Sequence, residues 1–501
     1  MSITSVLIAN RGEIAVRIAK TCKQMGIETW GIKTSAEPKA HYLTQVDKVF
    51  DLSDVFSEVL VFLDVEKLME IIKEIKVDAV HPGYGFLAEN AYFAQRCIND
   101  NVKFIGPSPD AIHKMGNKTI ARQIATKNEI PLASGTIRSI RNAQEAKKAA
   151  DKIGYPVIIK AASGGGGRGM RIVTKAEELA QNFRLATTEA EKAFNDPSVF
   201  VEKYIQNPKH IEFQILADEH GNVIHLGERE CSIQRKHQKL LEEAPSPALS
   251  PELRKEMGDT AVRIAQASNY SSAGTVEFLL DQSNNYYFME MNTRIQVEHP
   301  VTEMITGLDL IEQQIRVANG EKLTLTQSDI KLNGWAIECR INAEDVQAGF
   351  SPYLGTIEKM VLPTDQYVRI DSGVVEGDTI SPNFDSMIAK LIVWGETRDE
   401  AIANTLKALS KFWIKGLKTT IPFCKTVLNH KSFTNGSFNT SFIENELEIM
   451  HESNNEEEIL AAWFATLQYI EERQKEAENE VDFEQGKNIN PWVLNKRMKS
   501  F

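Results

Sequence analysis

The chain has 501 residues, of which 42% are hydrophobic and 25% are charged, and its formal net charge is −12. This composition is ordinary for a folded protein of roughly three domains, and it excludes an intrinsically disordered chain. The negative charge argues against a protein that binds nucleic acid or a membrane surface nonspecifically, because such proteins need a positive field.

The first part of the chain, up to about residue 115, predicts a doubly wound α/β domain. "SVLIA" is a short buried-type strand, Ile14, Ile18 and Cys22 then recur at helical spacing, and "TWGIKT" returns to a strand. The pattern repeats with the helical "VEKLMEIIKEIK" followed by "VDAVHPGYGF" and "VKFIGPSP". The first turn holds only Gly12 and lacks GxGxxG, so a Rossmann dinucleotide site is rejected.

Residues 116–330 predict a helix, a strand and then an antiparallel sheet. "NKTIARQIATKNE" is helical in character, and "YPVIIKAA" is a strand that leads into a run of glycines. Strands then alternate from residue 210 to 300, with one long helix near 251–268. The sequence therefore predicts an antiparallel sheet over 210–300, interrupted by that helix.

The C-terminal third contains two different segments. Residues 331–447 mix strands and helices, opening with "GWAIECRINAED" near 333. Residues 448–501 are acidic and carry Ile459, Trp463, Leu467 and Ile470 at helical spacing. We expect an amphipathic helix there, packed on its own domain or docked on a partner, followed by a tail.

Cysteine usage and hydropathy indicate the compartment. The five cysteines are far apart and form no CxxC pair, which favours neither a zinc site nor a disulfide framework. The N-terminal stretch has no basic-then-apolar signal layout, and no run approaches ~18 apolar residues. We therefore expect a soluble protein of the cytoplasm.

The glycine run lies in "IIKAASGGGGRGM", residues 158–170. A linker is one interpretation, but the run follows one strand directly and precedes another, "MRIV", as in a hairpin with a long loop tipped by Arg168. Backbone N–H groups without side chains can wrap phosphate oxygens, and such a loop can close over a nucleotide. No Walker A pattern is present, so the run by itself is a weak signal.

Three residues predict a divalent metal site. Glu290 and Asn292 are two apart on a predicted strand and therefore share a face, and Glu277 lies on the preceding strand. Oxygen ligands on one face suit Mg²⁺ bridging nucleotide phosphates, although a solvated strand face explains each residue singly.

An anion pocket is predicted next to this site. If the strand continues, Arg294, Gln296 and Glu298 fall on the same side, where a small anion could be held and deprotonated. A basic segment in an acidic protein, "ERECSIQRKHQK", is either a solvated face or the place for a polyanion. Its polar and basic members are Arg229, Gln234, Arg235, Lys236, His237 and Lys239.

These motifs together resemble the biotin carboxylase component of biotin-dependent carboxylases, in the ATP-grasp superfamily. The resemblance spans residue 3 to about 447 and rests on "VLIANRGEIAVRI", "HPGYGFLAEN", "FIGPS", "MGNK", "KAASGGGGRGM", "CSIQRKHQK", "EMNTRIQVEHPVTEMITG", "ECRINAED" and "DSMIAKLI". It implies four segments: an α/β pre-ATP-grasp domain over 1–115, an ATP-grasp domain over 116–330 with a mobile lid at about 133–205, an α+β C-terminal domain over 331–447, and an acidic helical extension over 448–501.

The resemblance also implies roles for individual residues. The ATP site would comprise Lys118, Lys160, Gly166, Gly167, Glu202, Lys203, Tyr204, Ile205, His210, Gln234, His237, Glu277 and Glu290. Two Mg²⁺ or Mn²⁺ ions would be held by Glu277, Glu290 and Asn292. Bicarbonate would be bound by Lys239, Arg294, Gln296 and Val297. The catalytic residues would be Lys239, Arg294, Glu298 as general base, and Arg340 facing the ureido group of biotin.

The implied activity is the ATP-dependent carboxylation of biotin with bicarbonate, through carboxyphosphate. The sequence has no Met-Lys-Met biotinylation motif and nothing like a carboxyltransferase, so we expect a separate biotin carboxyl carrier protein, carboxyltransferase subunits and a homodimer, and neither nucleic acid nor a membrane as partner. The final acceptor (acetyl-CoA, propionyl-CoA, pyruvate or another) cannot be deduced from these residues. The alternatives are an ATP-grasp ligase of the carbamoyl-phosphate synthetase type and a noncatalytic scaffold.

Overall fold

The computed structural model describes residues 2–52, 58–162, 169–445 and 466. By its contacts the chain divides into two units, Met1–Asn445 and Glu446–Phe501. The helix predicted around Trp463 and the glycines 164–167 lie outside the described residues.

The N-terminal part is built on a parallel sheet, with every pair of neighbouring strands parallel. In sheet order its strands are β3 (Lys48–Asp51), β2 (Glu28–Lys33), β1 (Ser5–Ile8), β4 (Ala79–His81) and β5 (Lys103–Phe104). Its main helices are α1 (Gly12–Gln24), α2 (Val65–Ile75) and α3 (Ala91–Asn99).

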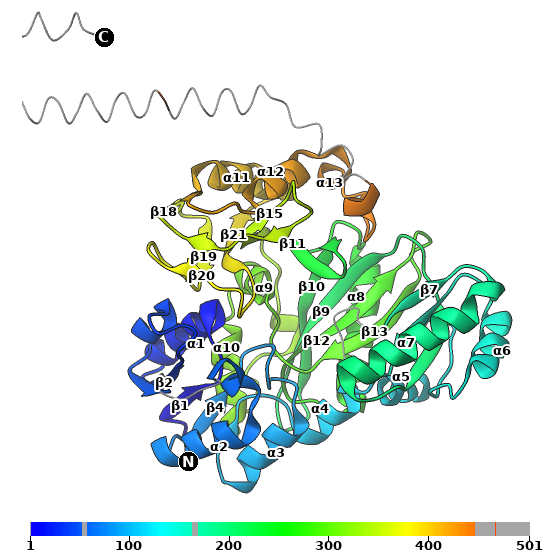
Figure 1. Cartoon of the computed structure of the whole chain (residues 1–501), viewed down its shortest axis with the longest axis horizontal. Coiled ribbons are helices and arrows are strands. Elements are labelled where there is room, and N and C mark those ends of the chain that lie inside the picture. The colour runs from blue at the N-terminus through cyan, green and yellow to red at the C-terminus, as the bar shows by residue number, and fades with distance from the viewer. Residues whose placement is uncertain (1, 53–57, 163–168, 446–465, 467–501) are drawn as a thin grey trace, which may run out of the picture. The chain divides into compact units, whose positions relative to one another are not determined.

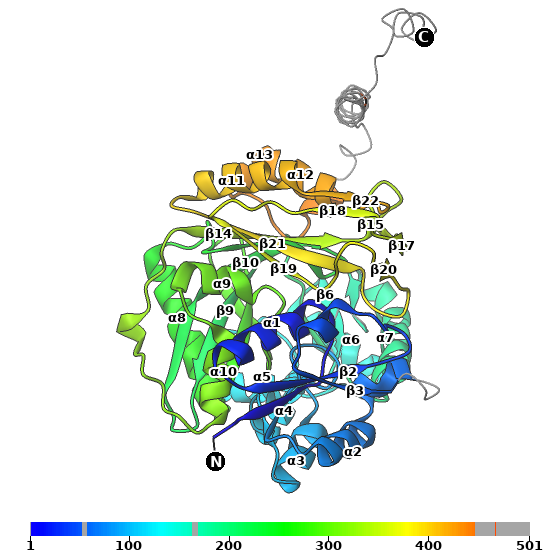
Figure 2. The same ribbon diagram turned by 90° about the vertical axis from the view of Figure 1, so that its left-hand side faces the viewer.

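Alternate residues of β1 enter two different cores. Val6 and Ile8 pack with the apolar face of α1, whereas Leu7 packs with the apolar residues of α2 and α3. Helices therefore cover both faces of the sheet, which confirms the predicted doubly wound α/β domain (Figure 2). Gly12 begins α1 at φ +64°, a conformation that favours glycine.

The central sheet has eight strands, and all neighbouring pairs are antiparallel. In sheet order they are β13 (Tyr286–Asn292), β12 (Ser272–Leu280), β9 (Lys209–Ala217), β10 (Val223–Arg235), β11 (Gln238–Ala244), β14 (Trp335–Asn342), β21 (Met387–Gly395) and β19 (Val368–Ser372). The antiparallel sheet predicted over 210–300 is confirmed. The sheet extends beyond it, because β14, β21 and β19 from the C-terminal part add to the edge at β11.

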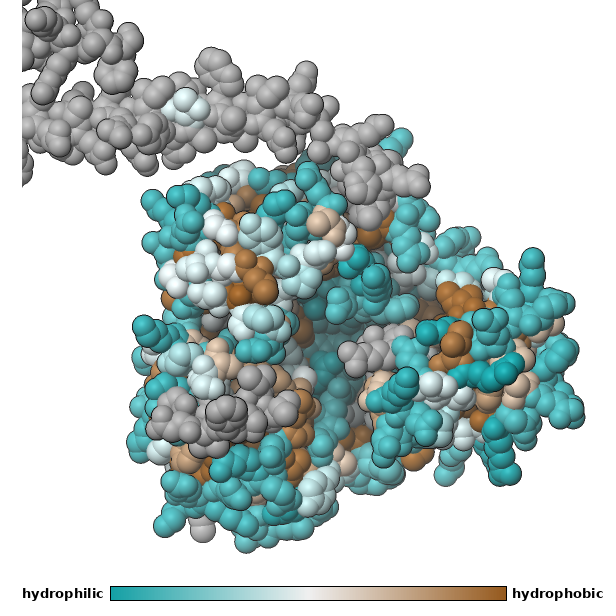
Figure 3. Space-filling view, viewed as in Figure 1, coloured by the Kyte–Doolittle hydropathy of each residue, from teal (hydrophilic) through white to brown (hydrophobic). Residues whose placement is uncertain are grey.

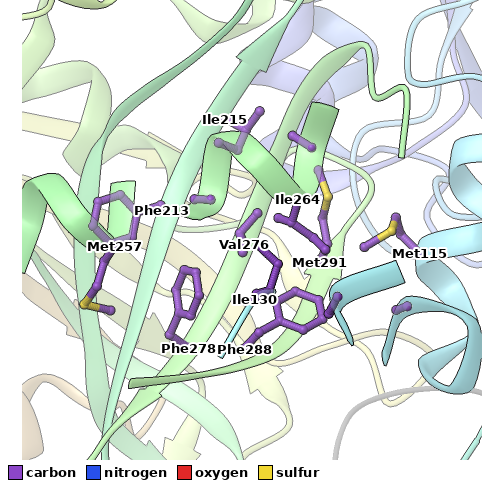
Figure 4. Close-up of a cluster of buried hydrophobic side chains, with 14 of the residues drawn as sticks. Met115, Ile130, Phe213, Ile215, Met257, Ile264, Val276, Phe278, Phe288 and Met291 are labelled. Carbon is purple, nitrogen blue, oxygen red and sulfur yellow. The ribbon is translucent and has the colours of Figure 1, made fainter. Parts of the chain in front are cut away.

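The core of this sheet lies on one face, under α8 (Pro251–Ala267), which confirms the predicted long helix. Met257 and Ile264 of α8 pack with Phe213, Val276 and Phe278 (Figure 4). Because successive residues of a strand point to opposite faces, this core directs the residues between them to the other face.

A smaller sheet forms the segment between residues 133 and 205. Its strands are β7 (Arg171–Val173), β6 (Val157–Ala161) and β8 (Val199–Lys203), and its helices are α6 (Ala143–Ile153) and α7 (Leu179–Phe194). β6 and β7 pair antiparallel, so the predicted hairpin around the glycine run is confirmed. The segment has a core of its own, in which Val157 and Ile159 meet Phe183 of α7, and it lies at one end of the molecule (Figure 1).

The remaining elements connect these layers. Four helices follow or precede the sheets: α4 (Pro109–Gly116), α5 (Lys118–Lys127), α9 (His299–Thr306) and α10 (Leu310–Ala318). Beyond the central sheet lie short paired strands and the helices α11 (Arg398–Lys411), α12 (Ile421–Asn429) and α13 (Lys431–Thr434) (Figure 2). The short pairs are β15 (Glu344–Asp345) with β16 (Ser351–Pro352), β17 (Gly355–Thr356) with β20 (Thr379–Ile380), and β18 (Lys359–Val361) with β22 (Trp413–Lys415). Among the described residues, no helix is both long and apolar enough to cross a membrane.

Phe278 is a direct test of this core. It is fully buried and makes edge-on ring contacts with Phe213, Phe288 and Tyr286. We expect Phe278→Ala to lower the free energy of unfolding by about 3–5 kcal/mol, measured by denaturant titration, because it leaves a cavity. The control is Leu185→Ala on α7, where the side chain is 48% exposed and the expected loss is within about 0.5 kcal/mol. Equal losses in the two variants would contradict the packing described.

Candidate functional site

A cavity of about 770 Å³ lies against the face of the central sheet opposite α8, and every predicted site residue that the structure describes lines it. Figure 3 shows this side of the molecule hollowed at its centre, with mostly hydrophilic walls. Gly166 and Gly167 lie outside the described residues. The lining residues that were predicted are Lys118, Lys160, Glu202, Lys203, Tyr204, Ile205, His210, Gln234, His237, Lys239, Glu277, Glu290, Asn292, Arg294, Gln296, Val297, Glu298 and Arg340.

The centre of the cavity floor is a lysine surrounded by three carboxylates, here called the Lys239 cluster: Lys239, Glu212, Glu277 and Glu298. The Lys239 Nζ atom forms an ion pair with Glu212 and lies 2.6 Å from Glu298 Oε1 and 3.2 Å from Glu277 Oε1. Burial lowers the pKa of the Lys239 ammonium, but the three carboxylates outweigh burial and hold that pKa well above its usual value. Lys239 is therefore a fixed cation.

The strand register brings the carboxylates together. Glu212 on β9 lies opposite Glu277 on β12, and Glu277 lies opposite Glu290 on β13, so three acidic residues form a row across neighbouring strands. Like charges directly opposite one another destabilise a sheet unless cations lie between them. Lys239 and His210, whose Nε2 lies 3.0 Å from Glu277 Oε2, flank one end, and Lys118 binds Glu290 at the other.

This row fits a divalent cation. Glu277 and Glu290 offer carboxylate oxygens toward the cavity from adjacent strands, and Asn292 follows on the same face of β13. The Asn292 Nδ2 atom donates to Glu277 Oε1 at 2.7 Å, which holds the two side chains side by side. Oxygen ligands in this arrangement are those that Mg²⁺ prefers.

Two lysines mark the end of the cavity that could hold phosphate. Lys118 begins α5 and binds Glu290, and Lys160 of β6 binds Glu202. Glu202 is fixed from behind by Arg122, whose Nη1 lies 2.7 Å from its Oε2. Burial, followed by the charge of Lys160, lowers the pKa of Lys118 to about 8. Two cations that close together are stabilised when a polyanion lies between them.

The predicted continuation of β13 is wrong. The strand ends at Asn292, and α9 begins at His299 with Pro300 in its first turn, so the chain leaves the ladder and runs as a loop from Thr293 to Glu298. Arg294, Gln296 and Glu298 nevertheless line the same cavity. The loop therefore achieves what strand alternation was expected to provide.

Glu298 lies between two cations. Its Oε2 atom lies 2.9 Å from Nη2 of Arg340, while its Oε1 atom is bound by Lys239. Burial raises the pKa of Glu298, but Lys239, Arg340 and Arg229 outweigh burial and hold it well below its usual value. Glu298 is thus an ionised carboxylate that can accept a proton once an anion shares these cations.

Arg229 was not given a specific role in the sequence analysis. It is fully buried beneath the cavity, with its Nη1 atom 2.7 Å from Gln214 Oε1 and its Nη2 atom 2.8 Å from Gln296 Oε1. The Nε atom binds Glu212, and two threonine hydroxyls accept the remaining N–H groups. Arg229 therefore positions Gln296 and Glu212 rather than facing the cavity.

Glu212 and Glu89 are the other site residues that were missed. In "HIEFQIL" His210, Glu212 and Gln214 alternate with apolar residues, so the sequence did carry the signal that Glu212 shares a face with His210. Glu89 lies in "HPGYGFLAEN" and holds Arg294, with its Oε2 atom 3.0 Å from the Arg294 Nε atom. No local pattern connects residues 205 positions apart.

Comparison with known proteins agrees with this geometry. Three family models match the chain: the N-terminal domain of biotin carboxylase over residues 2–112, the ATP-binding domain of the carbamoyl-phosphate synthase L chain over 117–326, and the C-terminal domain of biotin carboxylase over 338–445. Biotin carboxylase 1 of Bacillus subtilis is 52% identical over 443 residues, which cover 88% of this chain and 98% of the relative. The chain belongs to the biotin carboxylase family.

Other biotin carboxylase relatives are similarly close. One pyruvate carboxylase subunit, from Methanothermobacter thermautotrophicus, is 47% identical over 88% of this chain and 89% of its own length. The biotin carboxylase domain dimer of the 2-oxoglutarate carboxylase of Hydrogenobacter thermophilus, solved with MgADP, ADP and bicarbonate, matches with a TM-score of 0.88 and 45% identity over 91% of this chain and 100% of that one. A biotin carboxylase complex with β-γ-ATP from Campylobacter jejuni matches with a TM-score of 0.86 and 44% identity, over 89% of this chain and 99% of that one.

Arg229 provides a test of the buried network beneath this biotin carboxylase cavity. We expect Arg229→Met to lower the free energy of unfolding by about 3–5 kcal/mol, because it leaves Glu212 buried with one cation fewer. The matched control is Arg316→Met on α10, whose surface ion pairs with Glu312 and Glu321 are worth at most about 1 kcal/mol. Denaturant titration of both variants measures the difference. A loss at Arg229 no greater than that at Arg316 would show that the network is not held by this guanidinium.

Proposed function

We propose that the chain carboxylates biotin with ATP and bicarbonate, and that carboxyphosphate is the intermediate. The observation that carries this proposal is that one cavity is lined both by Lys118 and Lys160 and by Glu298 and Arg340. A shared cavity is what a two-step transfer needs, because a labile intermediate has to form beside its acceptor and away from water. Family membership and the domain matches support this assignment.

The nucleotide would lie between the 133–205 lid segment and the central sheet. Lys118 and Lys160 would neutralise charge on the phosphates, and the chain after β8, Glu202 to Ile205, would contact the adenine edge. The glycines, with Gly166 and Gly167 among them, would close over the phosphates as a cover. The remaining nucleotide contacts proposed are His210, Gln234 and His237.

Glu277, Glu290 and Asn292 would hold the magnesium that accompanies the nucleotide, in a two-ion site that Mn²⁺ could also occupy. When bound, such ions draw negative charge from the phosphate oxygens during transfer. In the Hydrogenobacter thermophilus structure the nucleotide is present as MgADP. The row of opposed carboxylates across β12 and β13 supports a cation at this place.

Bicarbonate would bind beside Glu298, held by Lys239, Arg294, Gln296 and the backbone of Val297. Its negative charge would share Lys239 and Arg340 with Glu298, which raises the basicity of that carboxylate. Glu298 would then take the bicarbonate proton, so that the oxygen formed can attack the terminal phosphorus of ATP. The products of this step are ADP and carboxyphosphate.

Biotin would accept the carboxyl group at the same place. Carboxyphosphate releases CO₂ and phosphate, the phosphate takes the N1′ proton of biotin, and the ureido nitrogen attacks CO₂. Arg340 is fixed by two carboxylates and points into the cavity, where it would stabilise the enolate-like ureido oxygen. The carboxyphosphate step is common to the rival carbamoyl-phosphate synthetase reaction, and the biotin step distinguishes the two.

The sequence and the relatives support further parts of the proposal. The absence of a Met-Lys-Met motif supports biotin supplied on a separate carrier protein, with carboxyltransferase subunits as further partners. The Hydrogenobacter thermophilus domain is a dimer, which supports a homodimer here. We keep the cytoplasm as the proposed compartment, the division into segments 1–115, 116–330, 331–447 and 448–501, and a partner-binding role for the last of them. The acyl acceptor stays open.

Biotin-dependent release of ADP tests the proposed reaction. The purified chain with Mg-ATP and bicarbonate should release ADP slowly, and free biotin should accelerate this release several-fold, because biotin drains carboxyphosphate toward carboxybiotin. A coupled assay for ADP, with bicarbonate omitted as the control, measures the effect. Release that ammonia stimulates and biotin does not would favour the rival ligase.

Glu298→Gln tests the assignment of the general base. The amide keeps the shape but cannot accept the proton, so kcat should fall by about 10²–10⁴-fold. ATP affinity, measured by equilibrium binding, should change by less than about threefold, since Glu298 does not face the lysines that bind phosphate. Glu321→Gln, at a 46% exposed surface carboxylate, is the matched control for an added amide. A large loss of ATP affinity in Glu298→Gln would contradict the role assigned.

A further inference from the structure

Two buried carboxylates behind Arg340 have no role in the reaction proposed so far. Glu242 on β11 and Glu338 on β14 are cross-strand partners, and both are fully buried. Glu338 and Arg340 are two apart on β14 and therefore share a face of the sheet. The two glutamates and the arginine thus form one layer beneath the cavity.

Glu338 lacks the partners that an ionised carboxylate needs. Among the described residues neither of its oxygens accepts a hydrogen bond, and the Oε2 atom of Glu242 also lacks a partner. An ionised carboxylate buried without donors costs several kcal/mol or more, so a group in this position takes up a proton. Its other neighbours do not relieve this cost, since Ile392 lies opposite it on β21 and Ala336 lies two residues before it on the same face.

The nearby cations are committed elsewhere. Arg340 directs its Nε atom to Glu242 Oε1 at 2.6 Å and its Nη2 atom to Glu242 and Glu298. Lys390, on β21, lies 2.8 Å from the carbonyl oxygen of Val297 and 3.0 Å from Glu13 Oε1. The one acceptor within cross-strand reach of Glu338 that the described contacts leave without a partner is Glu242 Oε2.

We propose that Glu338 is a neutral carboxylic acid that donates a hydrogen bond to Glu242, and that this pair is the permanent anchor of Arg340 during biotin carboxylation. The proposal rests on the proposed function. Burial raises the pKa of Glu338 well above its usual value, and burial, opposed by Arg340, raises the pKa of Glu242 to about 7. A hydrogen bond from Glu338 stabilises the ionised form of Glu242, which is the form that binds a guanidinium.

The reaction gives this anchor a purpose. Arg340 is held by Glu298 and Glu242, but Glu298 loses its charge when it takes the proton of bicarbonate. At that moment Arg340 has to remain in place for the ureido oxygen of biotin. An anchor whose charge does not change in the reaction keeps the guanidinium aligned through both steps. Glu242 and Glu338 are therefore positioning residues.

Two replacements of Glu338 test the proposal in the full chain with Mg-ATP, bicarbonate and free biotin. Glu338→Gln keeps a neutral donor of the same length, and Glu338→Met keeps the volume without a donor. We expect Glu338→Met to lower kcat/KM for biotin at least about tenfold, while KM for ATP changes less than about threefold. Glu338→Gln should retain about half or more of the wild-type kcat/KM for biotin.

Each outcome bears on a separate claim. A tenfold loss in Glu338→Gln would show that an ionised carboxylate is needed, and retention in Glu338→Met would show that the pair does not position Arg340; either result overturns the proposal. If Glu338→Met does not fold, the glutamine variant decides alone. In an Arg340→Lys background the Glu338→Met change should cost much less than in wild type, whereas additive losses would indicate general damage to the sheet. Wild-type protein without biotin stimulation would instead reject the proposed function itself.

Discussion

The buried ammonium group of Lys239 among Glu212, Glu277 and Glu298 is the interaction on which the rest of the site depends. Separating any of these charges from its partners inside the protein costs several kcal/mol, so the four side chains define one another's positions. The strand register supplies the geometry, because it aligns Glu212 with Glu277 and Glu277 with Glu290. The cavity can therefore hold negative ligands in an acidic protein, at the places where lysines and arginines complete the pattern.

The fold keeps this cluster in place by sharing one sheet between two parts of the chain. Strands β14 and β21 of the C-terminal part pair onto β11, so Arg340 reaches Glu298 across a continuous ladder. Lys390 joins the same sheet to the N-terminal part through Glu13 of α1 and to the anion loop through the carbonyl oxygen of Val297. Biotin and bicarbonate would thus meet where all three parts contribute side chains, which suits a transfer between two substrates.

Local patterns in the sequence were enough to predict the layers. The doubly wound N-terminal part, the antiparallel strands over 210–300, the long helix α8 and the hairpin around the glycine run all follow from periodicity and flanking residues, and family motifs identified the side chains that line the cavity. Strand alternation failed where Pro300 starts a helix, because the chain leaves the sheet before Arg294. Arg229, Glu89 and the Glu242–Glu338 pair were out of reach, since their roles come from contacts between distant residues and from burial.

The most direct test of the central claim is a crystal structure of this chain grown with MgADP and bicarbonate. The account predicts the diphosphate beside Lys118 and Lys160, the metal on Glu277 and Glu290, and bicarbonate in contact with Lys239, Arg294 and Glu298, all in one cavity. Nucleotide and bicarbonate bound in separate cavities, or a metal ion held away from the carboxylate row, would contradict it.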